Sequence, residues 1–129
     1  PINKYMKKII LVLTFVPFLL ATTCEDDDDQ IYCTQEAKAA LNVSVSLGAM
    51  SSITSEGVTV VATDGNYSET LVVVNENDPI FSGAYEREGS YTITVSKEGY
   101  QTQTSEIITV TRDVCHVIPQ FIHVVLEPN

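Results

Sequence analysis

Apolar and polar residues alternate with a repeat of two along much of the chain after residue 40, and no helical period persists. The alternation is clearest in the segments 41–47 and 90–96. Such a pattern is typical of a β-strand with one buried face and one face in water. Turn signals separate the segments, and Asp64-Gly65-Asn66 has the composition of a tight hairpin turn. We therefore expect strands over 41–47, 58–63, 67–74, 80–85, 90–96, 101–111 and 117–126.

Seven short strands separated by turns at intervals of about 8–12 residues predict an all-β fold. The arrangement that fits best is a single antiparallel seven-stranded β-sandwich, as in Ig-like domains. Pro119 falls inside the last expected strand. Because proline has no backbone N–H to donate, Pro119 predicts an edge position or a bulge for that strand.

The first thirty residues follow a different pattern. Lys7-Lys8 precedes an apolar run that continues to Ala21, and Cys24 follows shortly after. The thirteen residues 9–21 would span about 20 Å as a helix, against a hydrocarbon core of about 30 Å. A basic front, a short apolar run and small residues predict a secretory signal peptide that begins at Met6. The competing interpretation is a buried strand or helix that happens to lie first.

The stretch Leu20-Ala21-Thr22-Thr23-Cys24 resembles the lipobox of bacterial lipoproteins. The resemblance implies that residues 1–23 are removed as a lipoprotein signal peptide and that Cys24 is acylated as the new N-terminus. The chain departs from the usual pattern at Ala21, where a large aliphatic residue is common, and at Thr23, where Gly, Ala or Ser is common. A plain secretory cleavage nearby is therefore the alternative.

Five adjacent carboxylates follow the lipobox, namely Glu25, Asp26, Asp27, Asp28 and Asp29. The run resembles the acidic surface-export signal placed after the lipidated cysteine in one group of Gram-negative bacteria. This implies a lipid-anchored protein on the outer face of the outer membrane, with a periplasm-facing lipoprotein as the alternative. Mutual repulsion also predicts a solvated tether over residues 24–32, and both interpretations can hold together. The run lacks the spaced ligands and the glycine bend of a calcium loop.

Size and charge narrow the range of partners. Removal of residues 1–23 leaves 106 residues, the length of one domain. Three of the seven Lys and Arg residues lie in the predicted signal peptide. The remaining chain therefore has four basic and 17 acidic residues, and its formal charge is −13. Such a charge argues against nucleic acid and against electrostatic docking on anionic lipid. The expected partners are the membrane, through the acyl chains alone, and an envelope protein or polysaccharide.

Two cysteines remain once Cys24 is assigned to lipid. Cys33 lies before the first expected strand and Cys115 before the last. In an exported protein, an even number of remaining cysteines favours a disulfide. In the chain-entropy model, closing a loop of about 80 residues stabilises the folded state by up to roughly 4–5 kcal/mol. The alternatives are two free thiols, or a metal site of Cys33, Cys115 and His116, whose spacing matches no compact ligand pattern.

Three segments together resemble a known family: Gly57-Val58-Thr59-Val60, the run 85–95 with the sequence YEREGSYTITV, and Lys97-Glu98-Gly99-Tyr100. They are similar to the carboxypeptidase regulatory-like domain, a transthyretin-like sandwich that is common as a module in exported bacterial proteins. The segment 111–119 resembles the end of a lipoprotein subset, in which this cysteine pairs with one near the domain start. The resemblance implies that residues 33–129 form such a domain.

The resemblance implies no activity, because in carboxypeptidases this domain accompanies a separate zinc catalytic domain that does not fit in the chain. The hydroxyisourate hydrolases share the transthyretin-like fold and resemble one another in paired histidines, an arginine and a C-terminal Tyr-Arg-Gly-Ser. The chain closes instead with the sequence LEPN. His116 and His123 are both expected on the last strand, on opposite faces and about 20 Å apart. We expect no enzyme, no metal and no cofactor.

Two functions remain, a protein-interaction or structural accessory module and a carbohydrate-binding module. Four tyrosines, Tyr67, Tyr85, Tyr91 and Tyr100, would serve either as a stacking surface for sugars or as ordinary core and rim residues. An exposed aromatic cluster on one sheet face would favour sugar. A smooth polar face with an unpaired edge strand would favour a protein partner.

Overall fold

The computed structural model describes residues 31–129 of the chain, which divides into two units, Pro1–Tyr32 and Cys33–Asn129. The predicted signal peptide over 1–23, the acylation site Cys24 and the acidic run 25–29 lie outside the described residues. All regular structure within 31–129 is β-strand. In this part of the chain there is no helix long and apolar enough to cross a membrane.

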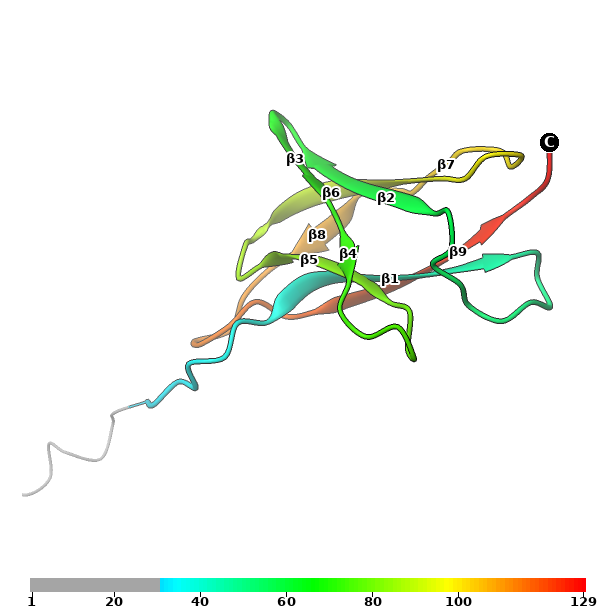
Figure 1. The fold of residues 1–129 in the computed structure, drawn as a ribbon. Coiled ribbons are helices and arrows are strands. Elements are labelled where there is room, and N and C mark those ends of the chain that lie inside the picture. The colour runs from blue at the N-terminus through cyan, green and yellow to red at the C-terminus, as the bar shows by residue number, and fades with distance from the viewer. Residues whose placement is uncertain (1–30) are drawn as a thin grey trace, which may run out of the picture. The chain divides into compact units, whose positions relative to one another are not determined.

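The described strands form two sheets. They are β1 (Ala39–Leu47), β2 (Thr59–Asp64), β3 (Tyr67–Thr70), β4 (Val72–Val73), β5 (Phe81–Tyr85), β6 (Gly89–Ser96), β7 (Gln103–Thr104), β8 (Ile108–Val110) and β9 (Gln120–Leu126). The first sheet has the order β4-β5-β1-β9, and the second has the order β3-β2-β6-β7, with β8 also pairing with β6 (Figure 1). The fold is therefore all-β, as the alternation predicted.

Side chains from both sheets form one hydrophobic core. Every second residue of β1 from Leu41 to Val45 has no exposed surface, and the same is true of β6 from Tyr91 to Val95. The residues between them are half-buried, and on the same face as Asn42 and Ser44 only Ala40 and Ser46, near the two ends of β1, are buried as well. The burial predicted from the alternation in these two segments is therefore confirmed.

Two of the seven expected strands are each divided in two. The segment 67–74 becomes β3 and β4, which belong to different sheets because the chain crosses between them at the buried Leu71. The segment 101–111 becomes β7 and β8. Between β7 and β8 the backbone N–H of Ile93 in β6 donates to the hydroxyl of Ser105 at 2.8 Å. This side-chain bond takes the place of a backbone bond and interrupts the strand. Residues 31–129 thus contain nine strands rather than seven.

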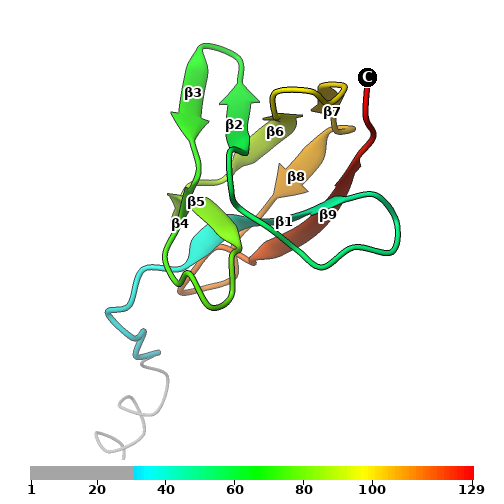
Figure 2. The ribbon, with the colours of Figure 1, turned by 45° about the vertical axis from the view of Figure 1, so that its right-hand side comes forward.

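The expectation of a purely antiparallel fold is wrong at one pair. β1 and β9 are parallel, with Leu41 opposite Gln120 and Leu47 opposite Leu126, and they run side by side in Figure 2. The chain reaches β9 from β8 in the other sheet, so no hairpin joins β9 to β1, and the two strands begin at the same end. Pro119 lies directly before β9, which is an edge strand, where its missing N–H removes no ladder bond.

Candidate functional site

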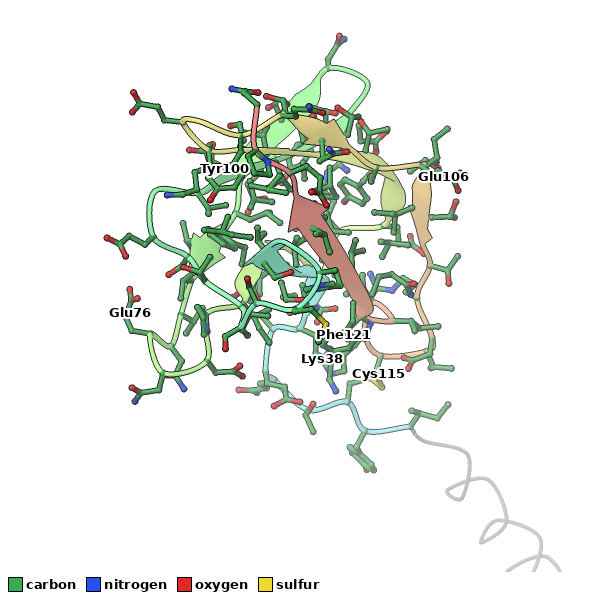
Figure 3. All side chains as sticks on the ribbon, turned by 90° about the vertical axis from the view of Figure 1, so that its right-hand side faces the viewer. Lys38, Glu76, Tyr100, Glu106, Cys115 and Phe121 are labelled. Carbon is green, nitrogen blue, oxygen red and sulfur yellow. A yellow bond between two sulfur atoms is a disulfide. The ribbon has the colours of Figure 1, made fainter. Side chains whose placement is uncertain are left out.

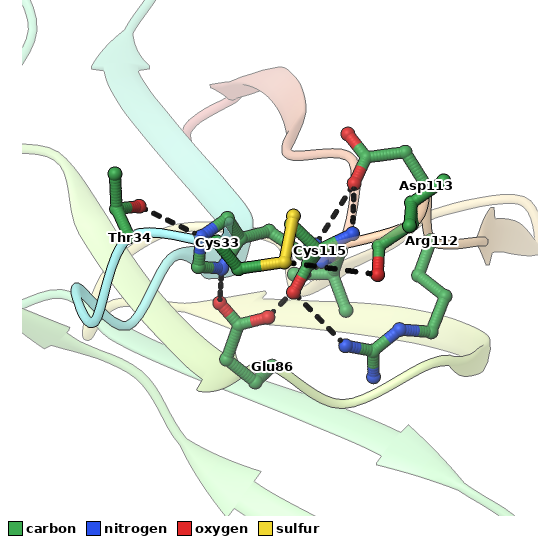
Figure 4. The surroundings of a disulfide bond; sticks show 9 residues. Cys33, Thr34, Glu86, Arg112, Asp113 and Cys115 are labelled. Carbon is green, nitrogen blue, oxygen red and sulfur yellow. Dashed lines mark hydrogen bonds and ion pairs between the residues drawn. A yellow bond between two sulfur atoms is a disulfide. The ribbon is translucent and has the colours of Figure 1, made fainter. Parts of the chain in front are cut away.

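A disulfide joins the chain just before β1 to the chain just before β9 (Figure 4). Its cysteines, Cys33 and Cys115, lie 82 positions apart in the sequence, and their Cα atoms are 5.2 Å apart. The predicted bridge is thus present, and it leaves neither two free thiols nor a metal site built on the two thiolates. Because β1 and β9 are parallel neighbours, the bridge ties together the beginnings of both strands.

Glu86 lies beside the disulfide and brings three hydrogen-bonding groups together (Figure 4). Its carboxylate accepts the backbone N–H of Lys38 at 2.9 Å and that of Val117 at 3.1 Å, and its Oε2 lies 2.7 Å from His116 Nδ1. These contacts, above all the Lys38 N–H, lower the pKa of Glu86 to about 2. One side chain therefore joins the turn after β5 to the segments that lead into β1 and β9.

His116 lies in the turn before β9, so the expectation that both histidines lie on the last strand is wrong for this one. Its Nε2 is 2.9 Å from Thr34 Oγ1, which leaves both ring nitrogens with partners. Asp113 closes the same turn by accepting the backbone N–H of His116 at 2.9 Å and of Cys115 at 2.8 Å, and these bonds lower the pKa of Asp113. The contacts of His116 and Asp113 position the disulfide segment.

His123 does lie on β9, and two serines of β1 hold it on the outer face of the sheet. Its Nδ1 is 2.8 Å from Ser44 Oγ and its Nε2 is 3.1 Å from Ser46 Oγ. A nucleophilic serine needs a histidine that a third group orients. No carboxylate in residues 31–129 is hydrogen-bonded to His123, and the same residues contain no metal-binding group of His, Cys, Asp and Glu side chains.

Two of the four tyrosines are engaged by one arginine. The Arg87 guanidinium carbon lies 3.7 Å from the ring centroid of Tyr67 and 5.5 Å from that of the fully buried Tyr91. Arg87 also pairs with Asp64 at 3.0 Å and donates to the Tyr91 hydroxyl at 2.9 Å. This cluster of cation–π contacts and hydrogen bonds links β2, β3 and β6. Tyr67 and Tyr91 are therefore not part of an exposed stacking surface.

The other two tyrosines lie at opposite ends of the first sheet. Tyr85 is opposite Ala39 at the start of β1, and Tyr100 pairs with Pro128 beyond the end of β9. Tyr85 is 46% exposed, whereas Tyr100 is half-buried. The four tyrosines thus do not gather on one sheet face.

A second cluster of hydrogen bonds connects β3 of one sheet to β5 of the other. The Tyr67 hydroxyl donates to the Glu69 carboxylate, and this bond above all raises the pKa of Tyr67 to about 12. Glu69 also accepts the backbone N–H of Ala84 at 3.2 Å. A Cβ at Gly83 would lie 2.4 Å from Glu69 Oε2, so only glycine leaves room for this carboxylate.

β9 is a seven-residue edge strand that carries Phe121 (Figure 3). It is the last strand of its sheet, with β1 on one side and no strand on the other. Backbone bonds close both ends of the free edge. At one end Ile118 N–H donates to Thr111 O at 2.8 Å, and at the other Gln101 N–H donates to Glu127 O at 2.9 Å. The seven residues of β9 lie between these closures.

A hollow of about 250 Å³ separates β9 from the second sheet along this edge, and we call it the β9 slot. Its lining comes from the region of β7 on one side and from β9 on the other: Gln103, Thr104, Ser105, Ile122, His123, Val124 and Val125. Ile122 and Val124 share the inner face with the core residues Val43 and Val45, yet they are only half-buried. The slot therefore leaves apolar surface of the inner face partly uncovered.

The outer face of β9 carries an exposed aromatic ring. Phe121 is 77% exposed and stands beside a hollow of about 130 Å³. That hollow is lined by Asn42, Ser44, Ile80, Phe121, Ile122 and His123. It combines one aromatic wall with hydroxyl, amide and imidazole groups.

The domain presents negative charge. Residues 31–129 contain four Lys and Arg residues against twelve Asp and Glu residues. Each base has a partner within the described residues: Lys38 pairs with Glu36, Arg87 pairs with Asp64, Lys97 donates to Glu56 O, and Arg112 donates to Cys115 O. The exposed carboxylates are therefore in excess.

The sequence contained a signal for the open edge but none for Glu86. Pro119 predicted an edge position for the last strand, and β9 is an edge strand. Glu86 lies in the polar segment 86–89, and no feature of the sequence distinguishes it from Glu88. No known family model matches this chain, and no curated protein matches it.

Proposed function

We propose that this chain is a lipid-anchored outer-membrane lipoprotein whose domain is a non-catalytic protein-interaction or structural accessory module. The domain would be a β-sandwich of the transthyretin-like kind, related to carboxypeptidase regulatory-like domains. Two sheets that share one core support the sandwich. The lipobox-like segment ending at Cys24 and the acidic run 25–29 support the anchor and its display at the cell surface.

The open edge of β9 is the observation that carries the interaction function. A strand edge presents unpaired N–H and C=O groups, and proteins bind extended segments by adding them to such an edge. Natural edge strands are commonly protected by charge, whereas the only titratable side chain in β9 is His123. An exposed edge without charged side chains is consistent with a surface kept for a partner.

A carbohydrate-binding module is the alternative, and one observation favours it. Phe121 offers a ring face next to the hydroxyl of Ser44 and the imidazole of His123, which is a combination that suits a sugar ring. None of the four tyrosines lines this hollow, and Tyr67 and Tyr91 are held by Arg87. A single aromatic wall gives weaker support than the open strand edge does.

The proposed function is tested by photo-crosslinking in intact cells. A photoreactive phenylalanine replaces Phe121 on β9, and in the control it replaces Val72 on β4. Both side chains are exposed, both lie in the row formed with Asn42 and Ser82, and they stand at opposite edges of one sheet. We expect one envelope protein to be crosslinked at position 121 and not at position 72. Crosslinks to polysaccharide alone, or equal products at both positions, would contradict the protein-interaction function.

A further inference from the structure

We propose that the β9 slot binds an extended, basic segment of another polypeptide, which adds to β9 as the next strand of the four-stranded sheet. This inference rests on the proposed function and names the chemistry of the partner. Three observations carry it: the length of the free edge, the side chains that line the slot, and the distribution of charge around it.

The free edge has a defined length. β9 comprises the seven residues Gln120–Leu126, which extend over about 23 Å at the usual rise of a strand. The bridge between Arg112 and Val117 closes one end, and the bridge between Tyr100 and Pro128 closes the other. A partner therefore contributes about seven residues in the extended conformation and no long strand.

The lining of the slot determines which side chains the partner places inward. Ile122 and Val124 offer partly exposed apolar surface from β9. Gln103 is paired with the inward-facing Val95, so its amide points toward the slot, and Ser105 lies next to it. Because alternate residues of an added strand face inward, we expect every second partner residue to be small and apolar, such as valine. The remaining residues face solvent.

The charge around the slot selects a basic partner. Glu106 follows the slot residue Ser105, and Glu127 directly follows β9. Glu98 lies in the loop whose Tyr100 pairs with Pro128, the residue after Glu127. All three carboxylates are exposed, and none of the three is ion-paired in the described part of the chain. A second copy of the domain would bring the same carboxylates together, whereas lysine or arginine on the solvent face of an added strand would complement them.

A pair of backbone-methylated peptides tests strand addition. The probe is a seven-residue peptide of alternating lysine and valine, and its affinity for the full-length protein in detergent is measured by calorimetry. One derivative carries N-methyl groups on the lysines, and the other carries them on the valines. Because successive N–H groups of a strand point to opposite sides, only one derivative loses the N–H groups that face β9. We expect that derivative to bind at least about tenfold more weakly, since several hydrogen bonds are lost, and the other to bind like the parent.

Matched charge reversals locate the site. Glu98→Lys with Glu127→Lys changes the charge beside the slot. Glu76→Lys with Asp78→Lys makes the same change in the loop between β4 and β5, at the opposite edge of the sheet. We expect the first double variant to weaken binding of the probe by about tenfold and the second to leave it within about twofold. Equal binding of both methylated peptides, or equal effects of both double variants, would show general charge attraction and overturn the proposal.

Two further results separate this inference from the function on which it rests. If the crosslink at position 121 identifies an envelope protein but the probe does not bind, the basic strand is wrong and the interaction module stands. If sedimentation shows a dimer that Val124→Lys disrupts and the probe does not bind, β9 pairs with a second copy, and the basic partner is again wrong.

Discussion

Cys33 and Cys115, which are 82 positions apart in the sequence, are bonded to each other shortly before two parallel strands. Parallel neighbours cannot be joined by a tight turn, so their common end has no short covalent connection of its own. The disulfide supplies that connection. It closes a loop that contains eight of the nine described strands, β1 to β8, and leaves only β9 outside.

The first prediction concerns this bridge. Replacing both cysteines by serine should lower the free energy of unfolding by up to about 4–5 kcal/mol, because the unfolded chain regains the entropy of an open loop of this length. Urea unfolding of the oxidised protein and of the double variant measures the difference. The single variants Cys33→Ser and Cys115→Ser serve as controls and should each match the double variant. A free energy unchanged by the loss of the bridge would contradict the prediction.

The second prediction concerns the carboxylate beside the bridge. The pKa of Glu86 is lowered to about 2 from an ordinary value of 4.5, so its contribution to stability is fully present above about pH 4.5 and is lost as the pH falls toward 2. Glu86→Gln should therefore be less stable than the natural protein at neutral pH. The difference in thermal midpoint should shrink between pH 4.5 and 2. Glu76→Gln, in an exposed loop, is the control and should leave the pH dependence unchanged.

The disulfide could be predicted from the sequence, whereas the contacts of Glu86 could not. Alternation along 41–47 and 90–96 predicted the buried faces of β1 and β6, because the period of a strand is a local property. The partner of Cys33 followed from counting cysteines. The parallel pairing of β1 with β9 and the three contacts of Glu86 depend on residues 30 or more positions away, and no local pattern records them.

A third prediction follows from the cluster of hydrogen bonds between β3 and β5. Glu69 raises the pKa of Tyr67 to about 12 from an ordinary value of 10, so the folded state retains the phenolic proton and loses this contribution as the pH rises from about 10 to 12. An ultraviolet titration of tyrosine should show one late-ionising group that disappears in Tyr67→Phe. Glu69→Gln should return that group toward 10. If Glu69→Gln leaves the titration curve unaltered, the hydrogen bond is not the cause.

The fourth prediction addresses the proposed anchor. Cells fed a clickable fatty acid should label the natural protein, and Cys24→Ser should abolish the label, because the proposed anchor is attached through Cys24. Cys33→Ser is the matched control and should keep the label, since the sulfur of Cys33 is held in the disulfide. Equal labelling of the natural protein and of Cys24→Ser would contradict acylation at this residue.

The last prediction separates display at the cell surface from anchoring. Replacing the acidic run 25–29 by the corresponding amides removes five negative charges and leaves Cys24 in place. If the run acts as an export signal, this variant should keep its fatty-acid label but become resistant to protease added to intact cells, while the natural protein is digested. Permeabilised cells supply the control, in which both proteins should be cleaved. Digestion of both proteins in intact cells would contradict the export signal. The acidic run would then be a solvated tether only.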